Sequence, residues 1–279
     1  MLDGPGIIVA SMSVAQPRGP SRRPWQYHSR SDLHSKVACW AVLFDLLQQS
    51  ALMREHAAAG KIVFGVNHKL TDFRTGKDKD LDLVIARPDG EPTPRTLTDL
   101  AVEYHVILDH DARKELYALP AIHRAPVGAV LVALEAKAAM TEHVKALPRF
   151  YDELNSSHQI VHGASNQALA VGLAMVNASP TFISPDRNKI QGAPVVTSHD
   201  QPRVATVAVE MVRNKLPRRS AGTGAGYDGL AILVVSAAND GSPVTLITDP
   251  PAPPPGDIFN YDNMVTRVAN EYDTTFRSI

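Results

Sequence analysis

The feature that most constrains the fold of this chain is an apolar run at residues 128–137, GAVLVALEAK. The run is unbroken until Glu135. A strand that is apolar on both faces is expected in the interior of a sheet that helices cover on each side. The run therefore predicts a layered α/β domain.

The periodicity of the remaining sequence predicts an alternation of helices and strands around this run. Residues 167–179 fit either a buried strand or an apolar helix. The order indicates an α/β domain in which a mixed central sheet is flanked by helices. The expected helices are 31–60, 97–122 (an insertion with uncertain breaks), 141–157, 199–216 and 259–276, and the expected strands are 61–68, 81–88, 128–137 and 229–240.

Residues 1–29 are rich in Pro, Ser, Gly and Arg and predict an irregular N-terminal arm. A flexible arm is one interpretation. The other is a basic arm, with Arg18, Arg22 and Arg23, that becomes ordered on a partner. Residues 30–279 are expected to form a single domain, with a core at about 31–178 and a C-terminal part at about 180–279.

Composition limits the classes of protein to which the chain can belong. The 279 residues carry a formal net charge of −1, so a nucleic-acid surface would require local clustering of charge. The single cysteine, Cys39, cannot form an internal disulfide and is expected to pack in the core. No apolar run is long enough to span a bilayer, and the N-terminus lacks the pattern of a secretory signal. These features predict a cytoplasmic protein without a membrane partner.

Charged residues at the end of the apolar run raise the question of function. Glu135 and Lys137 lie two residues apart, so both side chains would project from the same face of a strand. Burying such groups costs several kcal/mol unless they are paired or bound. A structural salt bridge is one explanation. If the strand that begins near Asp82 is a neighbour, the alternative is a site where two carboxylates bind a hard cation such as Mg²⁺.

The motifs KDLDLVIA and LEAK, followed at once by a helix, resemble the PD-(D/E)XK nuclease superfamily, which includes restriction endonucleases. The resemblance covers about residues 31–178. It implies that Asp82 and Glu135 bind the catalytic Mg²⁺, with the backbone carbonyl of Ala136 as a further ligand. It also implies that Lys137 assists the attacking water and that the central sheet is restriction-endonuclease-like.

The match departs from the family pattern at several points. Leu81 stands where the superfamily name has Pro, and the gap between Asp82 and Glu135 is long. Asp80 lies two residues before Asp82 and is an alternative or additional ligand. The first helix, which often carries a supporting acid in this superfamily, offers Asp32, His34 and Asp45.

The resemblance implies a Mg²⁺-dependent endodeoxyribonuclease, with a type II restriction enzyme as the first hypothesis. Its partner would be double-stranded DNA, and cutting both strands would require a homodimer or higher oligomer. The C-terminal part would supply DNA recognition or oligomer contacts. A nucleotide-activated phage-defence nuclease with little sequence specificity is the first alternative, and a DNA-binding protein without catalysis is the second.

Other motifs indicate a functional site less strongly. HQIVH places His158 and His162 at a spacing that suits zinc, but the pattern lacks the acid of the HExxH motif, so coincidence is favoured. GTGAG (222–226) lacks the Lys-Ser/Thr of a P-loop and indicates a turn. Basic side chains that would contact DNA phosphates are expected at Lys145, Arg149, Arg213, Lys215, Arg218 and Arg219.

Overall fold

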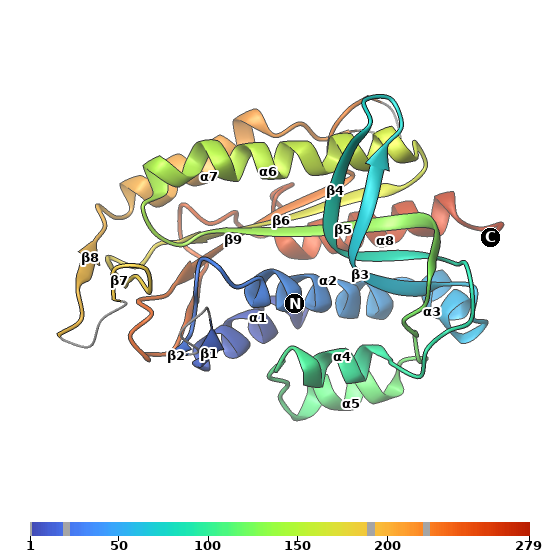
Figure 1. The fold of residues 1–279 in the computed structure, drawn as a ribbon, viewed down its shortest axis with the longest axis horizontal. Coiled ribbons are helices and arrows are strands. Elements are labelled where there is room, and N and C mark those ends of the chain that lie inside the picture. Colours follow the sequence, from blue (N-terminus) through green and yellow to red (C-terminus); the bar gives the residue numbers. More distant parts are fainter. Residues whose placement is uncertain (1, 19–22, 189–192, 220–223) are drawn as a thin grey trace.

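The computed structural model describes residues 2–18, 23–188, 193–219 and 224–279. Figure 1 shows a central sheet between two layers of helices. The helices are α1 (Gly4–Ser13), α2 (Leu33–Gln49), α3 (Ala51–Ala58), α4 (Leu97–Glu103), α5 (His110–Ala118), α6 (His143–Ala164), α7 (Arg203–Lys215) and α8 (Tyr261–Thr275). The strands are β1 (Gln16–Arg18), β2 (Arg23–Trp25), β3 (Val63–Asp72), β4 (Lys77–Pro88), β5 (Val127–Ala139), β6 (Leu169–Asn177), β7 (Thr181–Ile183), β8 (Val196–Ser198), β9 (Gly229–Ser236) and β10 (Thr245–Ile247).

The central sheet has six strands in the order β10-β9-β6-β5-β4-β3. Strands β5, β6 and β9 are parallel, whereas β3, β4 and β10 run antiparallel to their neighbours. This mixed sheet confirms the predicted α/β class. It also assigns residues 167–179, left open by the sequence, to strand β6. The C-terminal part adds β9 and β10 to the same sheet.

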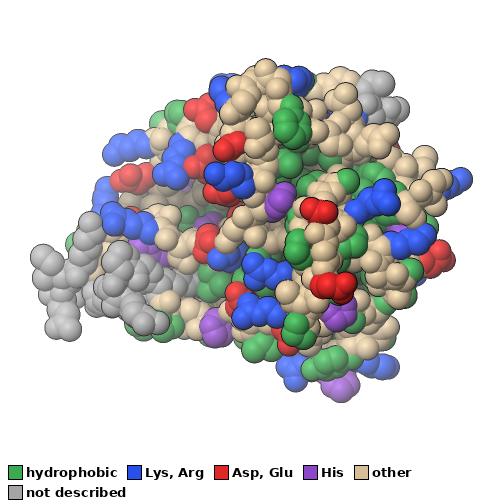
Figure 2. Space-filling view, turned by 45° about the vertical axis from the view of Figure 1, so that its right-hand side comes forward, with side chains coloured by type: hydrophobic (Ala, Val, Ile, Leu, Met, Phe, Trp, Pro, Cys, Tyr) green, Lys and Arg blue, Asp and Glu red, His purple; other side chains and the backbone are tan. Residues whose placement is uncertain are grey.

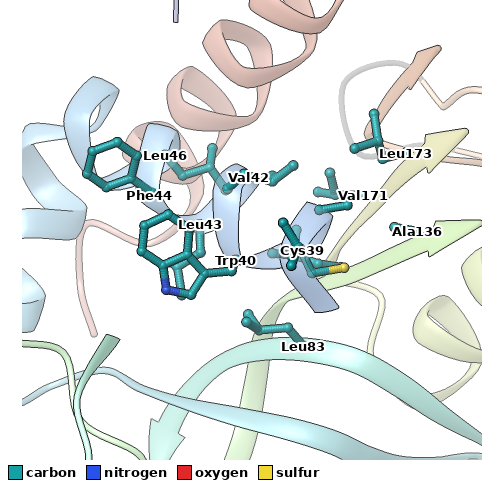
Figure 3. Packing of buried hydrophobic residues seen from close by; sticks show 14 of the residues in the cluster. Cys39, Trp40, Val42, Leu43, Phe44, Leu46, Leu83, Ala136, Val171 and Leu173 are labelled. Carbon is teal, nitrogen blue, oxygen red and sulfur yellow. The ribbon is translucent and has the colours of Figure 1, made fainter. Parts of the chain in front are cut away.

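Helix α2 covers one face of the sheet. Figure 3 shows its apolar side chains against Leu83 of β4, Ala136 of β5, and Val171 and Leu173 of β6. Cys39 belongs to this core and is buried, as predicted. The second core, between the sheet and helices α6 and α7, is built from other side chains of the same strands. Strand β5 is thus apolar on both faces because helices cover both.

The N-terminal segment differs from the prediction. Residues 1–29 were expected to be irregular, but Gly4–Ser13 form helix α1, and Ile7 and Ile8 are buried in the core. The apolar sequence GIIVASMS explains this, since its side chains are covered by α2 and β10. Arg22 lies outside the described residues, as do positions 222 and 223 of the GTGAG segment.

The long helix expected over 31–60 is divided at Ser50. The Ser50 side chain accepts a hydrogen bond of 2.9 Å from Met53 N and so caps the N-terminus of α3. Serine favours such cap positions because its hydroxyl satisfies a backbone N–H that the helix leaves unpaired. The insertion at 97–122 contains two short helices, α4 and α5. None of the helices in the described ranges is long and apolar enough to cross a bilayer.

A buried carboxylate in α2 makes stability dependent on pH. Asp45 is fully buried and accepts a 3.0 Å hydrogen bond from Gly4 N. Burial raises the pKa of Asp45 from 3.8 to about 7, and its hydrogen bonds oppose this less strongly. The folded protein therefore binds a proton more tightly than the unfolded chain does, and stability is lost as pH rises from about 4 to about 7.

We expect Asp45→Asn to remove this loss. The free energy of unfolding of the wild type should fall relative to the variant by about 1.4 kcal/mol per pH unit between about pH 4 and pH 7. Urea unfolding of both proteins across this interval measures the difference. Asp111→Asn, on the exposed surface of α5, is the matched control. A difference between wild type and Asp45→Asn that does not change with pH would contradict the prediction.

Candidate active site

The strands that carry Asp82 and Glu135 are neighbours, and they part at these two residues. Regular pairing of β4 with β5 ends at Leu83 and Leu134, and Asp82 and Glu135 are the next residues on each strand. Beyond this point β4 stays paired with β3 as far as Lys77, while β5 stays paired with β6. The separation leaves room between two strands of the sheet for side-chain chemistry.

The carboxylate of Asp82 occupies this gap. Its Oδ2 accepts a hydrogen bond of 3.0 Å from Ala136 N, and its Oδ1 accepts one of 3.3 Å from the Ser35 hydroxyl of α2. The Asp82 side chain thus accepts from a backbone N–H of β5 that is not paired with the backbone of β4, because the two strands separate here. In a strand, the N–H and C=O of one residue project to the same edge. The carbonyl of Ala136 therefore projects toward the Asp82 side of β5.

Glu135 is held by two ammonium groups. Its side chain is 2% exposed, and its Oε1 lies 2.8 Å from Lys137 Nζ and 3.5 Å from Lys79 Nζ. Its Oε2 lies 3.4 Å from Asp82 N. Glu135 and Lys137, which the sequence placed on one face, are in contact as an ion pair. Charge pairing of this kind compensates for the cost of removing a carboxylate from water.

The proximity of these charges changes their proton affinities. Burial raises the pKa of Asp82 from 3.8 to about 6, and repulsion from Glu135 adds to the increase. Burial lowers the pKa of Lys137, but attraction to Glu135 and Asp82 outweighs it and leaves this pKa above its ordinary value. Lys137 is therefore a charged ammonium at neutral pH.

A pocket of about 440 Å³ opens on this group of residues. Asp82, Ala136 and Lys137 line it, whereas Glu135 lies behind them, away from solvent. Its other walls come from residues 27–35 at the start of α2, from residues 138–141 at the end of β5, and from the first half of α6. The pocket thus brings together segments that are far apart in the sequence.

Glu153 on α6 and Lys79 on β4 join the site without having been predicted. Glu153 lines the pocket, lies 3.9 Å from Lys137 Nζ and pairs at 2.6 Å with Arg149. Lys79 donates to the Glu153 carbonyl at 2.9 Å. Arg149 and Glu153 are one helical turn apart, so the polar stripe that indicated Arg149 also contained the signal for Glu153.

The other acid and histidine candidates lie in different places. Asp80 is exposed on β4 and does not line the pocket. Asp32 and His34 line the pocket, and Asp32 pairs with Lys36 at 2.8 Å. Asp45 is buried against Gly4, away from the pocket lining. Asp80, which the sequence placed on the same face as Asp82, is thus not among the residues that line the pocket.

A local change in β3 accompanies a break in the alternation of β4 at Asp82. Asn67, at the position facing Asp82, has a φ of 48°, and the regular pairing of β3 with β4 misses this one position while the register is the same on both sides. A left-handed residue breaks the alternation of a strand. Consistent with this, Leu81 packs in the core under α6, whereas Leu83 packs in the core under α2.

The basic residues predicted to contact DNA fall into two groups. Lys145 and Lys215 are exposed, and Arg149 lines the pocket with a side chain that is 86% exposed. Arg213 instead pairs with Asp257 at 2.7 Å, and the guanidinium groups of Arg213 and Arg218 lie over the ring of Phe259. Figure 2 shows basic and acidic side chains interspersed over the face it presents.

Arg219 is a correction to the sequence analysis. It is 6% exposed and lies 3.2 Å from Asp228, which also accepts a hydrogen bond from Ala170 N. His162 Nε2 lies 3.5 Å from Asp228, and His158 contacts Asn155. Arg219 therefore stabilises the core and does not face a nucleic acid.

The donor atoms at the pocket can be compared with the requirements of a metal. Within the described part of the chain, no group of three or more His, Cys, Asp or Glu side chains is arranged to hold one. Mg²⁺ requires fewer protein ligands, because it is held by one or two carboxylates together with water and substrate oxygens. Asp82, Glu135 and the Ala136 carbonyl supply such oxygens. A cation there would relieve the repulsion that raises the pKa of Asp82, but would compete with Lys79 and Lys137 for Glu135.

Comparison of the chain with protein families, with curated proteins and with solved structures gives no significant match.

Proposed function

We propose that this chain is a Mg²⁺-dependent endodeoxyribonuclease of the PD-(D/E)XK type with a restriction-endonuclease-like core. The observation that carries the proposal is the meeting of Asp82 and Glu135 where β4 and β5 part, with Lys137 in the same pocket. A carboxylate and a lysine that line a pocket, with a second carboxylate directly behind them, suit phosphodiester hydrolysis. The resemblance rests on a helix-strand-strand-strand-helix-strand order, and the order α2, β3, β4, β5, α6, β6, interrupted by α3 and by the α4–α5 insertion, supports it.

Each residue of the site has its own role in the proposed reaction. Asp82, Glu135 and the Ala136 carbonyl would hold Mg²⁺, which when bound supplies a Lewis acid for the scissile phosphate. Because Lys137 carries a proton at neutral pH, it acts as a hydrogen-bond donor and not as a base. Its ammonium would orient the attacking water or stabilise negative charge that develops on the phosphate.

The proposal extends to the assembly and to the type of nuclease. Cutting both strands requires two sites, so a homodimer or higher oligomer on double-stranded DNA is part of it. A sequence-specific type II restriction enzyme would yield discrete fragments with 5′-phosphate ends. Activity that appears only after a cyclic oligonucleotide is added would instead indicate the phage-defence nuclease.

Plasmid DNA tests the proposal directly. We expect the wild type to cut plasmid with Mg²⁺ and to leave it intact with EDTA. Asp82→Asn should lower the rate at least about 100-fold, since even residues that only support metal ligands contribute 10- to 100-fold. Electrophoresis, followed by sequencing of the ends, measures both the rate and the specificity.

Glu103→Gln is the matched control, because Glu103 is an exposed carboxylate on α4, paired with Arg95 outside the pocket. Equal cleavage by the wild type and Asp82→Asn would overturn the assignment of Asp82. Retention of DNA without Mg²⁺-dependent products, with or without cyclic oligonucleotides, would favour the DNA-binding protein that lacks catalysis.

A further inference from the structure

The β3–β4 hairpin presents an apolar side chain at its tip. Figure 1 shows the hairpin rising from the sheet and crossing α6. Phe73, in the turn between the two strands, is 80% exposed, more than any other large hydrophobic side chain of the described residues. The strands expected over 61–68 and 81–88 extend further toward each other, since β3 ends at Asp72 and β4 begins at Lys77, and the turn is short.

The turn that carries Phe73 is held by a buried carboxylate. Asp72 is 3% exposed and accepts hydrogen bonds from Arg74 N at 2.9 Å and from the Thr75 hydroxyl at 2.8 Å. Its backbone carbonyl accepts from Gly76 N at 2.7 Å, and Gly76 has the positive φ of 68° that this turn requires. The Phe73 side chain is therefore displayed from an ordered turn.

Helix α6 packs against the turn and holds it in place. Arg74 donates to the carbonyl of Gln159 at 3.2 Å. A Cβ at Gly163 would lie within 2.2 Å of the Asp72 carboxyl group, so only glycine lets the turn approach α6 this closely. Because the turn is held in place, little conformational entropy remains to be lost when Phe73 is covered by a partner.

The charges around Phe73 favour an anionic partner. Lys69 and Arg74 have side chains that are each 64% exposed, and Lys77 is exposed beside them. Among the acids, Asp72 is buried and pairs with Arg74 at 3.2 Å, and Asp78 is paired with Lys69 at 3.6 Å and accepts from Thr71 at 2.7 Å. Asp80 is exposed, nearer to the base of the hairpin.

We propose that this tip is a DNA contact in which Phe73 stacks on or between bases while Lys69, Arg74 and Lys77 face phosphates. The inference rests on the proposed function. Aromatic side chains stack on bases, and apolar wedges flanked by cations insert at base steps. The extended residues between Lys77 and Asp82 place the turn about 17 Å from Asp82. That reach corresponds to about five base pairs from the bond to be cut.

Fluorescence anisotropy in EDTA, with a duplex long enough to span the pocket and the tip, tests this inference without cleavage. We expect Phe73→Ala to weaken DNA binding about 5- to 100-fold, the range for loss of one stacked base. Phe73→Trp should bind like the wild type because it preserves the stacking surface. Tyr117→Ala, which removes a 70% exposed aromatic from α5, is the matched control and should leave affinity unchanged.

Equal affinity of the wild type and Phe73→Ala would overturn the inference, as would a wild type that binds no DNA. If sedimentation velocity shows that Phe73→Ala loses self-association while its DNA affinity is unchanged, the tip is a contact between copies of the chain and the inference is wrong. Failure of the proposed function appears separately, as the absence of Mg²⁺-dependent cleavage by the wild type.

Discussion

Replacement of Lys137 by methionine is expected to lower the rate of Mg²⁺-dependent DNA cleavage by about 100- to 1,000-fold, the usual cost of losing one preorganised donor to a developing charge. Lys137 is the ammonium of the pocket that lies 2.8 Å from Glu135, and methionine fills a similar volume without a charge. Single-turnover cleavage of plasmid at saturating Mg²⁺ measures the chemical step. A rate close to that of the wild type would contradict the role of Lys137.

The stability of two variants distinguishes a catalytic role of Lys137 from a role limited to the ion pair with Glu135. Lys137→Met alone leaves Glu135 buried with Lys79 as its remaining cation, so we expect a loss of about 3 kcal/mol in the free energy of unfolding. The double variant Glu135→Gln, Lys137→Met removes both charges and should regain much of that stability. It should remain inactive. Recovery of cleavage together with stability would indicate that the pair only supports the fold.

Removal of the buried carboxylate at position 228 is expected to destabilise the protein by about 3–5 kcal/mol, the range for breaking a buried ion pair on one side. Asp228→Ala would leave Arg219 without its carboxylate partner at 3.2 Å and Ala170 N without its acceptor at 2.8 Å. Chemical unfolding followed by circular dichroism measures the loss.

The exposed pair of Asp200 with Arg203 provides the comparison for this experiment. Both side chains are about two-thirds exposed, so Asp200→Ala should cost under about 1 kcal/mol. Should Asp228→Ala prove as mild as Asp200→Ala, the assignment of Arg219 to the core would be wrong.

The sequence predicted the elements well wherever hydrophobic periodicity decides the structure. Strand β5 was readable from an apolar run, and the shared face of Glu135 and Lys137 follows from the period of two in a strand. Residues 167–179 could not be assigned, because an apolar run of that length suits a buried helix or a buried strand equally.

What the sequence could not supply were the positions of side chains across elements. The register of Asp82 against Glu135 depends on pairing across the α4–α5 insertion, and no local pattern encodes it. The break in alternation opposite Asp82 depends on the backbone of Asn67, which lies on another strand. The burial of Arg219 depends on Asp228, which is brought to it only by the fold.

Helix α6 links the two regions to which function is assigned above. Its 22 residues make a rod about 33 Å long, with Arg149 in the first half, Glu153 at the middle, and Gln159 and Gly163 in the second half. The regular rise of this helix therefore fixes the distance between the pocket residues and the residues that support the hairpin turn.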